Sequence, residues 1–322
     1  MNLRLTRAIR LAAMSVGALL AGAIGLVGPT VAEAAAHYQF QTYNDNNDTT
    51  FNQLLGINNS GVIAGYFGSG AQGHPNMGYL VFPKYYQNYY LDENVPNSMQ
   101  TQVTAINDGG INVGFWSDTN DNDAAKNANF GFYRLHGKFH TVNFPTSDNS
   151  NPAVNQLLGV NDSNVAVGFY NDSAGNSHGY LYSINNHHFR ALNVPSNVTS
   201  DTAAAINNRG DIAGFATIGG NTEAFLLRGG QFMPLSVSGA VMTQAFGVND
   251  RDEVVGVYTV GTGNNAQMHG FTWTPGHGFT TVDDPNGIGA TTINGVNDRG
   301  QLVGFYTDGA GNTDGMLATP RH

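Results

Sequence analysis

Apolar and polar positions follow a repeating pattern along this chain. Short runs of apolar and aromatic residues are separated by clusters of Gly, Asn and Asp, which is typical of β-strands joined by turns. After residue 36, no segment keeps the 3.6-residue period of an amphipathic helix. The pattern therefore predicts an all-β protein.

One motif recurs six times. It consists of Gly or Ala, then Ile or Val, then Asn, then Asn or Asp, with a Gly seven residues after the first Asn. The first copy reads GINNSGVIAGYF (56–67), and the first Asn of each copy is Asn58, Asn107, Asn161, Asn207, Asn249 and Asn297. Asn and Asp favour turns, and the small residue indicates a strand that its neighbour approaches closely.

Each copy predicts four strands. In the third copy, an apolar strand precedes Asn161, and the Asn-Asp turn leads to VAVGFY (165–170), a polar loop, GYLYS (179–183) and FRALNVP (189–195). The copies are 42 to 54 residues apart. Four antiparallel strands at this spacing are typical of a β-propeller blade.

The strand count predicts how such a ring closes. Six copies carry the first three strands, but only five fourth strands follow them, and the segment YQFQTYND (38–45) is similar to the fourth strand FTTVDDP (279–285). We therefore predict one domain over 37–322, a six-bladed β-propeller of four-stranded antiparallel blades. Its N-terminal strand completes the last blade and removes an open edge.

The N-terminus has the pattern of a secretory signal peptide. Arg4, Arg7 and Arg10 precede an apolar run over 11–27, and small-x-small cleavage sites follow before residue 37. A retained membrane anchor is the alternative, but the run is shorter than the roughly 20 residues of a membrane span. We expect residues 1–36 to be removed and the protein to be secreted, either extracellular or periplasmic.

The repeat also resembles a known family. The Gly-aromatic strand and the tripeptides HGY (178–180), EAF (223–225) and HGF (269–271) are similar to those of the HAF-repeat family of bacterial secreted proteins. The resemblance covers essentially the whole chain after residue 36. It implies secretion and a repeat architecture, and it assigns no functional residue.

Charge excludes several classes of partner. The net charge is −10, and it becomes −12 without residues 1–36, which hold three Arg and Glu33. Nucleic acids and anionic membranes require a basic surface, so neither is expected as a partner. The chain contains no cysteine and therefore no disulfide. We expect a monomer without a cofactor.

The variable loops are the predicted recognition surface. Loops from second to third strand and crossings from fourth to first strand share one face of a propeller, and variable loops on a rigid scaffold commonly carry function. A polar residue also stands five positions before each repeat Asn, at Gln53, Gln102, Gln156, Thr202, Gln244 and Thr292. A ring of amides and hydroxyls at the channel mouth would suit a neutral, hydroxyl-rich ligand such as a sugar. The alternative is that these groups satisfy strand ends and hold channel water.

No local motif identifies a catalytic site. The titratable residues on or beside the variable loops, which an enzyme could use, are Asp118, Asp172, His178, Glu223, His269 and Asp314. The acidic run DTNDND (118–123) could hold calcium through Asp118, Asp121 and Asp123, but it lacks the Gly and Glu of a calcium loop, so a solvated loop is favoured. The histidines show no zinc spacing, and no metal site is predicted.

Two classes of function remain. The first is a secreted binding or scaffold protein that recognises a glycan, a small molecule or a protein through its variable loops. The second is an extracellular enzyme, a hydrolase, lyase or cyclase, with its site at the mouth of the central channel, since residues from different blades leave no local motif. The absence of a convincing catalytic set in the sequence favours the first.

Overall fold

The structure is a computed structural model, which describes residues 37–85, 89–119, 126–146 and 150–321. The predicted signal peptide, residues 1–36, lies outside the described residues. The described part contains 24 β-strands and one 3-10 turn, η3 (Gly263–Asn265), so the all-β prediction is confirmed. No helix in these ranges has the length and apolar character needed to cross a membrane.

The strands form four-stranded antiparallel units in chain order. The first unit comprises β2 (Asn52–Ile57), β3 (Ile63–Phe67), β4 (Met77–Val81) and β5 (Tyr90–Asp92). The second comprises β6 (Gln100–Ile106), β7 (Asn112–Ser117), β8 (Phe130–Leu135) and β9 (Lys138–Val142). The third comprises β10 (Asn155–Val160), β11 (Val165–Asn171), β12 (Ser177–Ser183) and β13 (His188–Ala191).

The later units follow the same order. The fourth comprises β14 (Val198–Ile206), β15 (Ile212–Ile218), β16 (Asn221–Arg228) and β17 (Gln231–Leu235). The fifth comprises β18 (Met242–Val248), β19 (Val254–Val260), β20 (Gln267–Thr274) and β21 (Gly278–Thr281), and it joins the fourth through one parallel pair, Thr222 with Met242. The sixth comprises β22 (Thr291–Val296), β23 (Leu302–Thr307), β24 (Thr313–Pro320) and β1 (Tyr38–Thr42).

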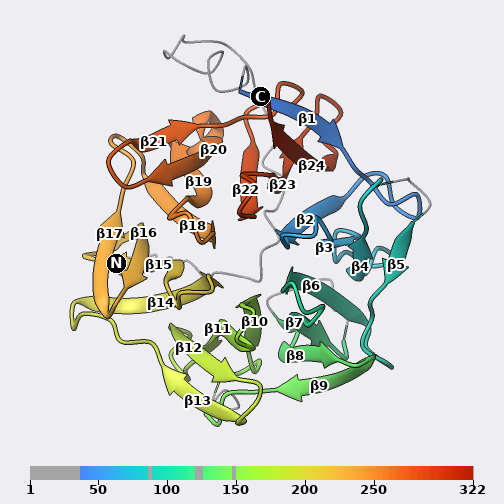
Figure 1. Cartoon of the computed structure of the whole chain (residues 1–322), viewed down its shortest axis with the longest axis vertical. Helices are drawn as coiled ribbons and strands as arrows, with labels where there is room; N and C mark the ends of the chain where they lie inside the picture. Colours follow the sequence, from blue (N-terminus) through green and yellow to red (C-terminus); the bar gives the residue numbers. More distant parts are fainter. Residues whose placement is uncertain (1–36, 86–88, 120–125, 147–149, 322) are drawn as a thin grey trace, which may run out of the picture.

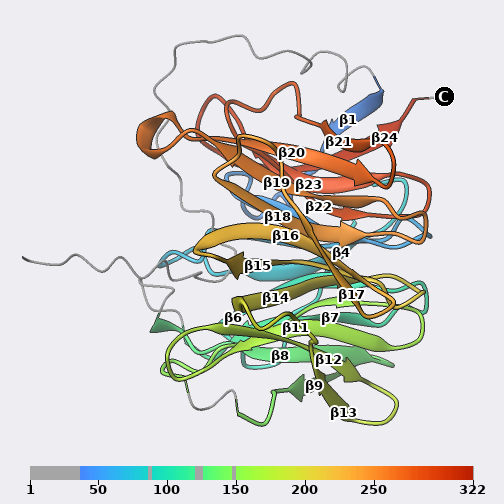
Figure 2. The same cartoon turned by 90° about the vertical axis from the view of Figure 1, so that its left-hand side faces the viewer.

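The sixth unit combines both ends of the described chain. Strand β1 pairs antiparallel with β24, from Tyr38 opposite Pro320 to Thr42 opposite Met316. In Figure 1 the units surround a common centre, with the first strand of each unit innermost and the fourth strand outermost. Seen from the side, the strands run from one face of the molecule to the other (Figure 2).

The hydrophobic core lies between neighbouring units. Six of the buried apolar clusters each combine residues of two adjacent units, and one of them joins Leu54 and Tyr79 of the first unit with Val303 and Leu317 of the sixth. A single sheet with two apolar faces cannot remove both faces from water by itself. Each unit therefore needs its neighbouring units to bury its apolar side chains.

The small residue of the motif lies where two innermost strands meet. A Cβ on Gly56 would lie 2.8 Å from the carbonyl oxygen of Thr104 and 2.9 Å from the Cα of Ala105, in the next unit. A Cβ on Gly159 would lie 2.9 Å from the Cα of Ala205. The close approach predicted from Gly or Ala at this position is therefore present in the structure.

Candidate functional site

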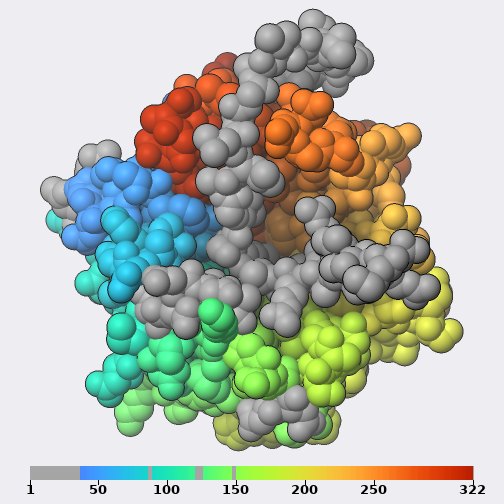
Figure 3. All heavy atoms as spheres, turned by 180° about the vertical axis from the view of Figure 1, so that it is seen from behind, coloured from blue at the N-terminus to red at the C-terminus, as the bar shows by residue number. Residues whose placement is uncertain are grey.

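The molecule has two unlike faces. The turn face carries the six Asn-Asn or Asn-Asp turns between the first and second strands. The loop face carries the variable loops between second and third strands and the crossings from one unit to the next. Figure 3 shows the molecule from the loop face, with the coloured units arranged around the centre.

On the turn face, the repeat asparagines form a closed ring of hydrogen bonds. Each side-chain amide donates to the backbone carbonyl of the next repeat Asn, from Asn58 to Asn107 at 3.0 Å and so on around the six. The series returns from Asn297 to the carbonyl of Asn58 at 3.1 Å. Each side-chain oxygen also accepts from its own turn, as Asn161 Oδ1 does from the backbone N–H of Val165 at 3.0 Å.

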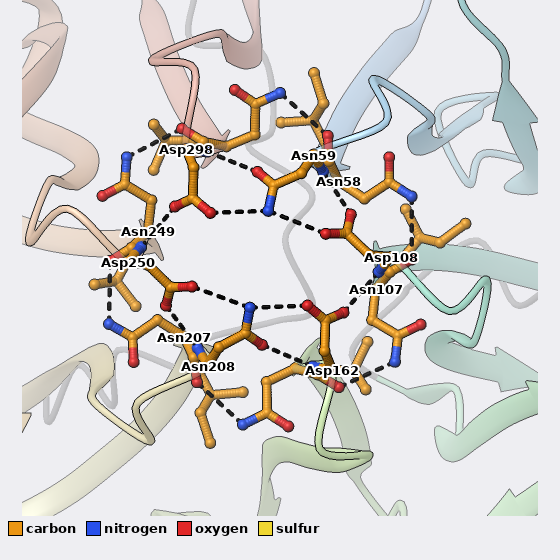
Figure 4. Close-up of a pocket in the computed structure, with 18 residues that line it drawn as sticks. Asn58, Asn59, Asn107, Asp108, Asp162, Asn207, Asn208, Asn249, Asp250 and Asp298 are labelled. Carbon is orange, nitrogen blue, oxygen red and sulfur yellow. Dashed lines mark hydrogen bonds between the residues drawn. The ribbon is translucent and has the colours of Figure 1, made fainter.

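The residues that follow the repeat asparagines form a second ring, which we call the Asx ring. It consists of Asn59, Asp108, Asp162, Asn208, Asp250 and Asp298. Each backbone N–H donates to the side-chain oxygen of the next member, at 2.7 to 2.8 Å, and Asp298 donates back to Asn59. The amides of Asn59 and Asn208 each bridge the carboxylates on either side (Figure 4).

The two rings surround a shallow bowl on the central axis. Its floor is the Ile or Val before each repeat Asn, and its cavity volume is about 80 Å³. The bowl holds four carboxylates, each already bonded to its neighbours in the ring. The sequence predicted only turns at these positions. The rings could have been inferred from the recurrence of Asn followed by Asn or Asp in all six copies.

The predicted ring of Gln and Thr is mostly buried. Five of its six members are 1 to 4 % exposed, while Gln244 is half-buried. Gln53 accepts a 2.8 Å hydrogen bond from the Tyr66 hydroxyl, and Gln156 donates to Asn129 of the preceding unit at 2.6 Å. Their burial and these hydrogen bonds agree with the alternative that the groups satisfy polar atoms of neighbouring strands and loops, and their role in binding a ligand stays a prediction.

One member of that set, Gln102, does line a pocket on the loop face. The pocket lies between the first and second units, and its residues come from the β3–β4 loop, β6, β7 and the β7–β8 loop. They are Ser69, Gly70, Asn76, Gln100, Thr101, Gln102, Phe115, Trp116, Ser117, Asn127 and Asn129. None of them is charged, and the cavity volume is about 30 Å³.

Some polar atoms of this pocket are buried and have no hydrogen-bond partner among the described residues. They include Oε1 of Gln102, a residue that is 4 % exposed, and the indole Nε1 of Trp116. Buried polar atoms are nearly always paired, by protein, water or ligand. Trp116 was not among the residues that the sequence singled out. Its place after the Gly-Phe pair of the second strand gives no signal, because the cluster on which it packs combines residues of the first and second units.

The candidate catalytic residues are spread over five units. Hydrogen bonds join one pair of the six, Asp172 and His178, whose Oδ2 and Nε2 atoms are 2.9 Å apart. Glu223 is half-buried on β16, and Asp314 is buried and accepts a bond from the Asn44 amide at 2.7 Å. None of the six lines the bowl or the loop-face pocket.

A second imidazole–carboxylate pair lies in the fifth unit. His269 Nδ1 and Asp283 Oδ2 are 2.7 Å apart, and their side chains are 19 % and 15 % exposed. The ring of Tyr258 stacks on His269 with centroids 5.2 Å apart. Such a pair orients an imidazole for proton transfer, and of its two members only His269 was predicted from the sequence.

Carboxyl groups divide into two classes by environment. Burial opposes ionisation of Asp172, but hydrogen bonds from His178, Asn176 and Ala174 outweigh it and lower its pKa to about 2. Burial raises the pKa of Glu253 and of Asp284 above their ordinary values.

The predicted calcium ligands are only partly described. Asp118 is exposed at the end of β7, while Asp121 and Asp123 lie outside the described residues. Among the residues with described positions, no group of three or more His, Asp or Glu is arranged to hold a metal ion.

Comparison with known proteins adds information on the fold. No family model and no curated protein matches this chain. Among solved structures, it is similar to a protein of unknown function from Dyadobacter fermentans, with a TM-score of 0.57, 8 % identity and coverage of 88 % of this chain and 99 % of that one.

Two further solved structures are similar to this chain, and in each the similar region covers 88 % of this chain and 99 % of the solved chain. A putative TolB from Agrobacterium tumefaciens has a TM-score of 0.55 and 10 % identity. A streptogramin B lyase has a TM-score of 0.50 and 10 % identity. Since TolB and the lyase are β-propellers, the chain has a β-propeller fold, and at this identity the likeness extends to the fold alone.

Proposed function

We propose that this chain is a six-bladed β-propeller of the HAF-repeat kind, exported through its N-terminal signal and closed by its own N-terminal strand. The repeat-Asn hydrogen bonds support this proposal, because they pass through six units and return to the first. The pairing of β1 with β24 supports it as well.

We further propose that the protein is a secreted binding protein whose loop face recognises a neutral, hydroxyl-rich ligand, of which a glycan is the leading candidate. The observation that carries this proposal is the composition of the loop-face pocket, whose described lining residues supply amides, hydroxyls and two aromatic rings and carry no charge. Uncharged donors and acceptors beside aromatic surface suit sugars. On the turn face, by contrast, the corresponding side chains are bonded to one another.

A binding assay on the mature chain, residues 37–322, tests this function. Neutral oligosaccharides are expected to raise the melting temperature, since a ligand that binds only the folded state stabilises it by about 2.7 kcal/mol at a hundred times its Kd. Ser69→Trp, at the exposed rim of the pocket, should weaken the shift. The control Asn186→Trp, in an exposed turn on the opposite face, should leave it unchanged. Equal effects of the two variants, or no shift with any oligosaccharide, would contradict the proposal.

An extracellular enzyme is the second candidate, and the pair of His269 with Asp283 is the observation that favours it. A half-buried imidazole held by a carboxylate can serve as a general acid or base. A hydrolase, lyase or cyclase of this kind should turn over an oligosaccharide, with activity reduced at least about a hundredfold in His269→Ala. Turnover that persists in this variant would remove the pair from consideration.

A further inference from the structure

We propose that the first and second units separate to admit the ligand, so that their junction controls the size of the loop-face pocket. The inference rests on the proposed function, since the loop-face pocket lies between these two units. Its cavity volume of about 30 Å³ has room for about two water molecules, whereas a sugar ring is several times larger. A sugar ring can therefore enter only if the pocket widens.

One face of the second unit connects the pocket with the interior of this junction, which we call the first junction. On β7, Asn112, Gly114 and Trp116 are alternate residues, and Trp116 lines the pocket. Their partners on β8 include Phe132 and Arg134. Alternate residues and directly paired residues point to the same side of a sheet. Phe132 and Trp116 pack in the apolar cluster that the two units share, so Asn112 and Arg134 also face the first unit.

Polar and charged groups are buried in the first junction. Glu93, which follows β5 of the first unit, is 1 % exposed, and its Oε1 accepts a hydrogen bond from Arg134 Nη1 at 2.6 Å. Asn112 is also 1 % exposed, and among the described residues neither its Oδ1 nor the buried Nε of Arg134 has a hydrogen-bond partner. Burial raises the pKa of Glu93 above its ordinary value, although Arg134 opposes this shift. We call these three residues the polar triad.

The other five junctions have apolar or aromatic residues at the equivalent positions. The strand pairs that correspond to Asn112 and Arg134 are Ile63–Val81, Ala166–Tyr182, Ile212–Leu227, Val254–Trp273 and Leu302–Ala318. The residues that correspond to Glu93 are Tyr43, Val142, Leu192, Leu235 and Val282. Each of these five belongs to, or packs against, the apolar cluster of its own junction. The polar triad therefore distinguishes the first junction from the rest of the ring.

A polar junction opens at a lower cost than an apolar one. Separating two apolar surfaces exposes them to water, and the cost grows with the exposed area. Charged and amide groups regain their hydration when a junction opens, which offsets part of the cost. Apolar residues of similar volume commonly match or exceed the stability that a buried ion pair provides, so stability does not explain the polar triad. Easier separation of these two units does.

Hydrogen exchange of the unmodified mature chain, followed by NMR, measures this separation. The backbone N–H of Thr101 donates to the carbonyl of Asn76 across the first junction at 2.8 Å, and the N–H of Asn155 donates to Asn129 across the next junction at 3.0 Å. Both donors are 1 % exposed and lie at the start of an innermost strand. The protection factor of Thr101 should be lower than that of Asn155 by about tenfold. Equal protection, or lower protection at Asn155, would overturn the proposal.

A triple variant gives the first junction the residues that join the third and fourth units. It combines Glu93→Leu, Asn112→Ile and Arg134→Leu, after the set Leu192, Ile212 and Leu227. Thermal unfolding establishes whether this variant folds, and the comparison of the two amides in the unmodified chain does not depend on it. The control is Arg190→Leu, which removes one charge from the exposed strand β13.

The triple variant should hold the first junction closed. The protection factor of Thr101 should rise about tenfold while that of Asn155 stays unchanged. The Kd of a neutral oligosaccharide, measured by calorimetry, should also rise about tenfold, because the open pocket is populated less often. Arg190→Leu should change neither quantity. A triple variant that folds and leaves the protection of Thr101 unchanged would overturn the role of the polar triad.

Binding results separate this inference from the proposed function. If the triple variant binds neutral oligosaccharides as tightly as the unmodified chain, separation of the units is not part of binding, and the loop face still binds glycans. If no oligosaccharide binds the unmodified chain, the proposed function fails and the role of the junction in admitting a ligand fails with it. The exchange of Thr101 still decides whether the two units separate.

Discussion

Each repeat asparagine forms hydrogen bonds in two directions. Asn161 accepts from the backbone N–H groups of Ser163 and Val165 in its own turn, and its amide donates to the carbonyl of Asn207 in the next unit. Asp in its place would fix the turn equally well but could not donate, and Ser or Thr would not reach the next unit. A side chain that both shapes a turn and joins units explains why Asn stands at this position in every copy.

Replacing this residue should therefore destabilise the whole fold. Asn161 is 6 % exposed, and Asn161→Ala leaves the Val165 N–H and the Asn207 carbonyl without their partner. We expect a loss of about 1–3 kcal/mol in the free energy of unfolding. Denaturant unfolding measures it, with Asn186→Ala in an exposed turn as the control. A loss no larger than that of the control would show that water replaces these bonds at little cost.

Asp172 predicts a pH dependence with a defined sign. Its pKa is lowered from an ordinary value of 3.8 to about 2, so the folded state prefers the ionised form. The resulting stabilisation is complete above the ordinary value and is lost as the pH falls through about 2. Thermal unfolding of the native chain and Asp172→Asn should differ at pH 5, and the difference should shrink between about pH 4 and pH 2. A difference that stays constant with pH would mean that the charge of Asp172 contributes nothing.

At the scale of the strand, a bulge and a glycine are combined in every unit. The register of the innermost strand shifts three residues before the repeat Asn, as between Leu157 and Gly159 opposite β11. Gly168 of the second strand lies opposite this shift, and a Cβ there would lie 1.9 Å from the carbonyl oxygen of Gln156. The corresponding glycines of the other units show distances of 1.9 to 2.4 Å. Only a residue without a side chain allows the two strands this approach.

Gly168→Ala is therefore expected to be among the most damaging single-methyl additions. The methyl would meet backbone, which cannot rotate away, so the unfolding free energy should fall by about 3 kcal/mol or more. Gly109→Ala is the matched control, because its Cβ would lie 3.4 Å from the nearest atom, in ordinary contact. Thermal unfolding of both variants checks the prediction, and similar melting temperatures would contradict it.

At the scale of the whole molecule, stability depends on the contacts between units. The buried clusters combine neighbouring units, and the cluster of Leu54 and Val303 joins the first unit to the sixth. The same junction is reinforced by Asn294, whose amide donates to the carbonyl of Leu54 at 3.1 Å. A gap at this junction would expose apolar surface on two units at once.

Removing strand β1 should open the sixth unit. A chain that begins at residue 43 lacks the strand that pairs with β24, so the edge of β24 and part of the cluster containing Tyr38 and Phe40 become exposed. We expect a lower melting temperature and self-association by gel filtration, whereas a chain that begins at residue 37 should remain a stable monomer. A chain from residue 43 with unchanged stability and size would contradict the proposed closure.

The sequence by itself determined the local structure of this protein. Alternation of apolar runs with Asn, Asp and Gly specifies strands and turns over a few residues, and the recurrence of one motif specifies a repeated unit. The Gly or Ala before each turn also indicated a close approach, and the structure places the next unit there. These features could be predicted because they depend on residues that are near one another in the chain.

Only the tertiary structure decided which polar side chains are available to a ligand. Gln53, Gln102 and Gln156 occupy the same position of the motif, yet their partners are Tyr66 of the same unit for the first and loops of the preceding unit for the others. Those loops differ from unit to unit, so the repeat pattern carries no information about them. Trp116 and Gln102 both line the loop-face pocket for the same reason, because a pocket between two units is surrounded by residues from separate parts of the chain.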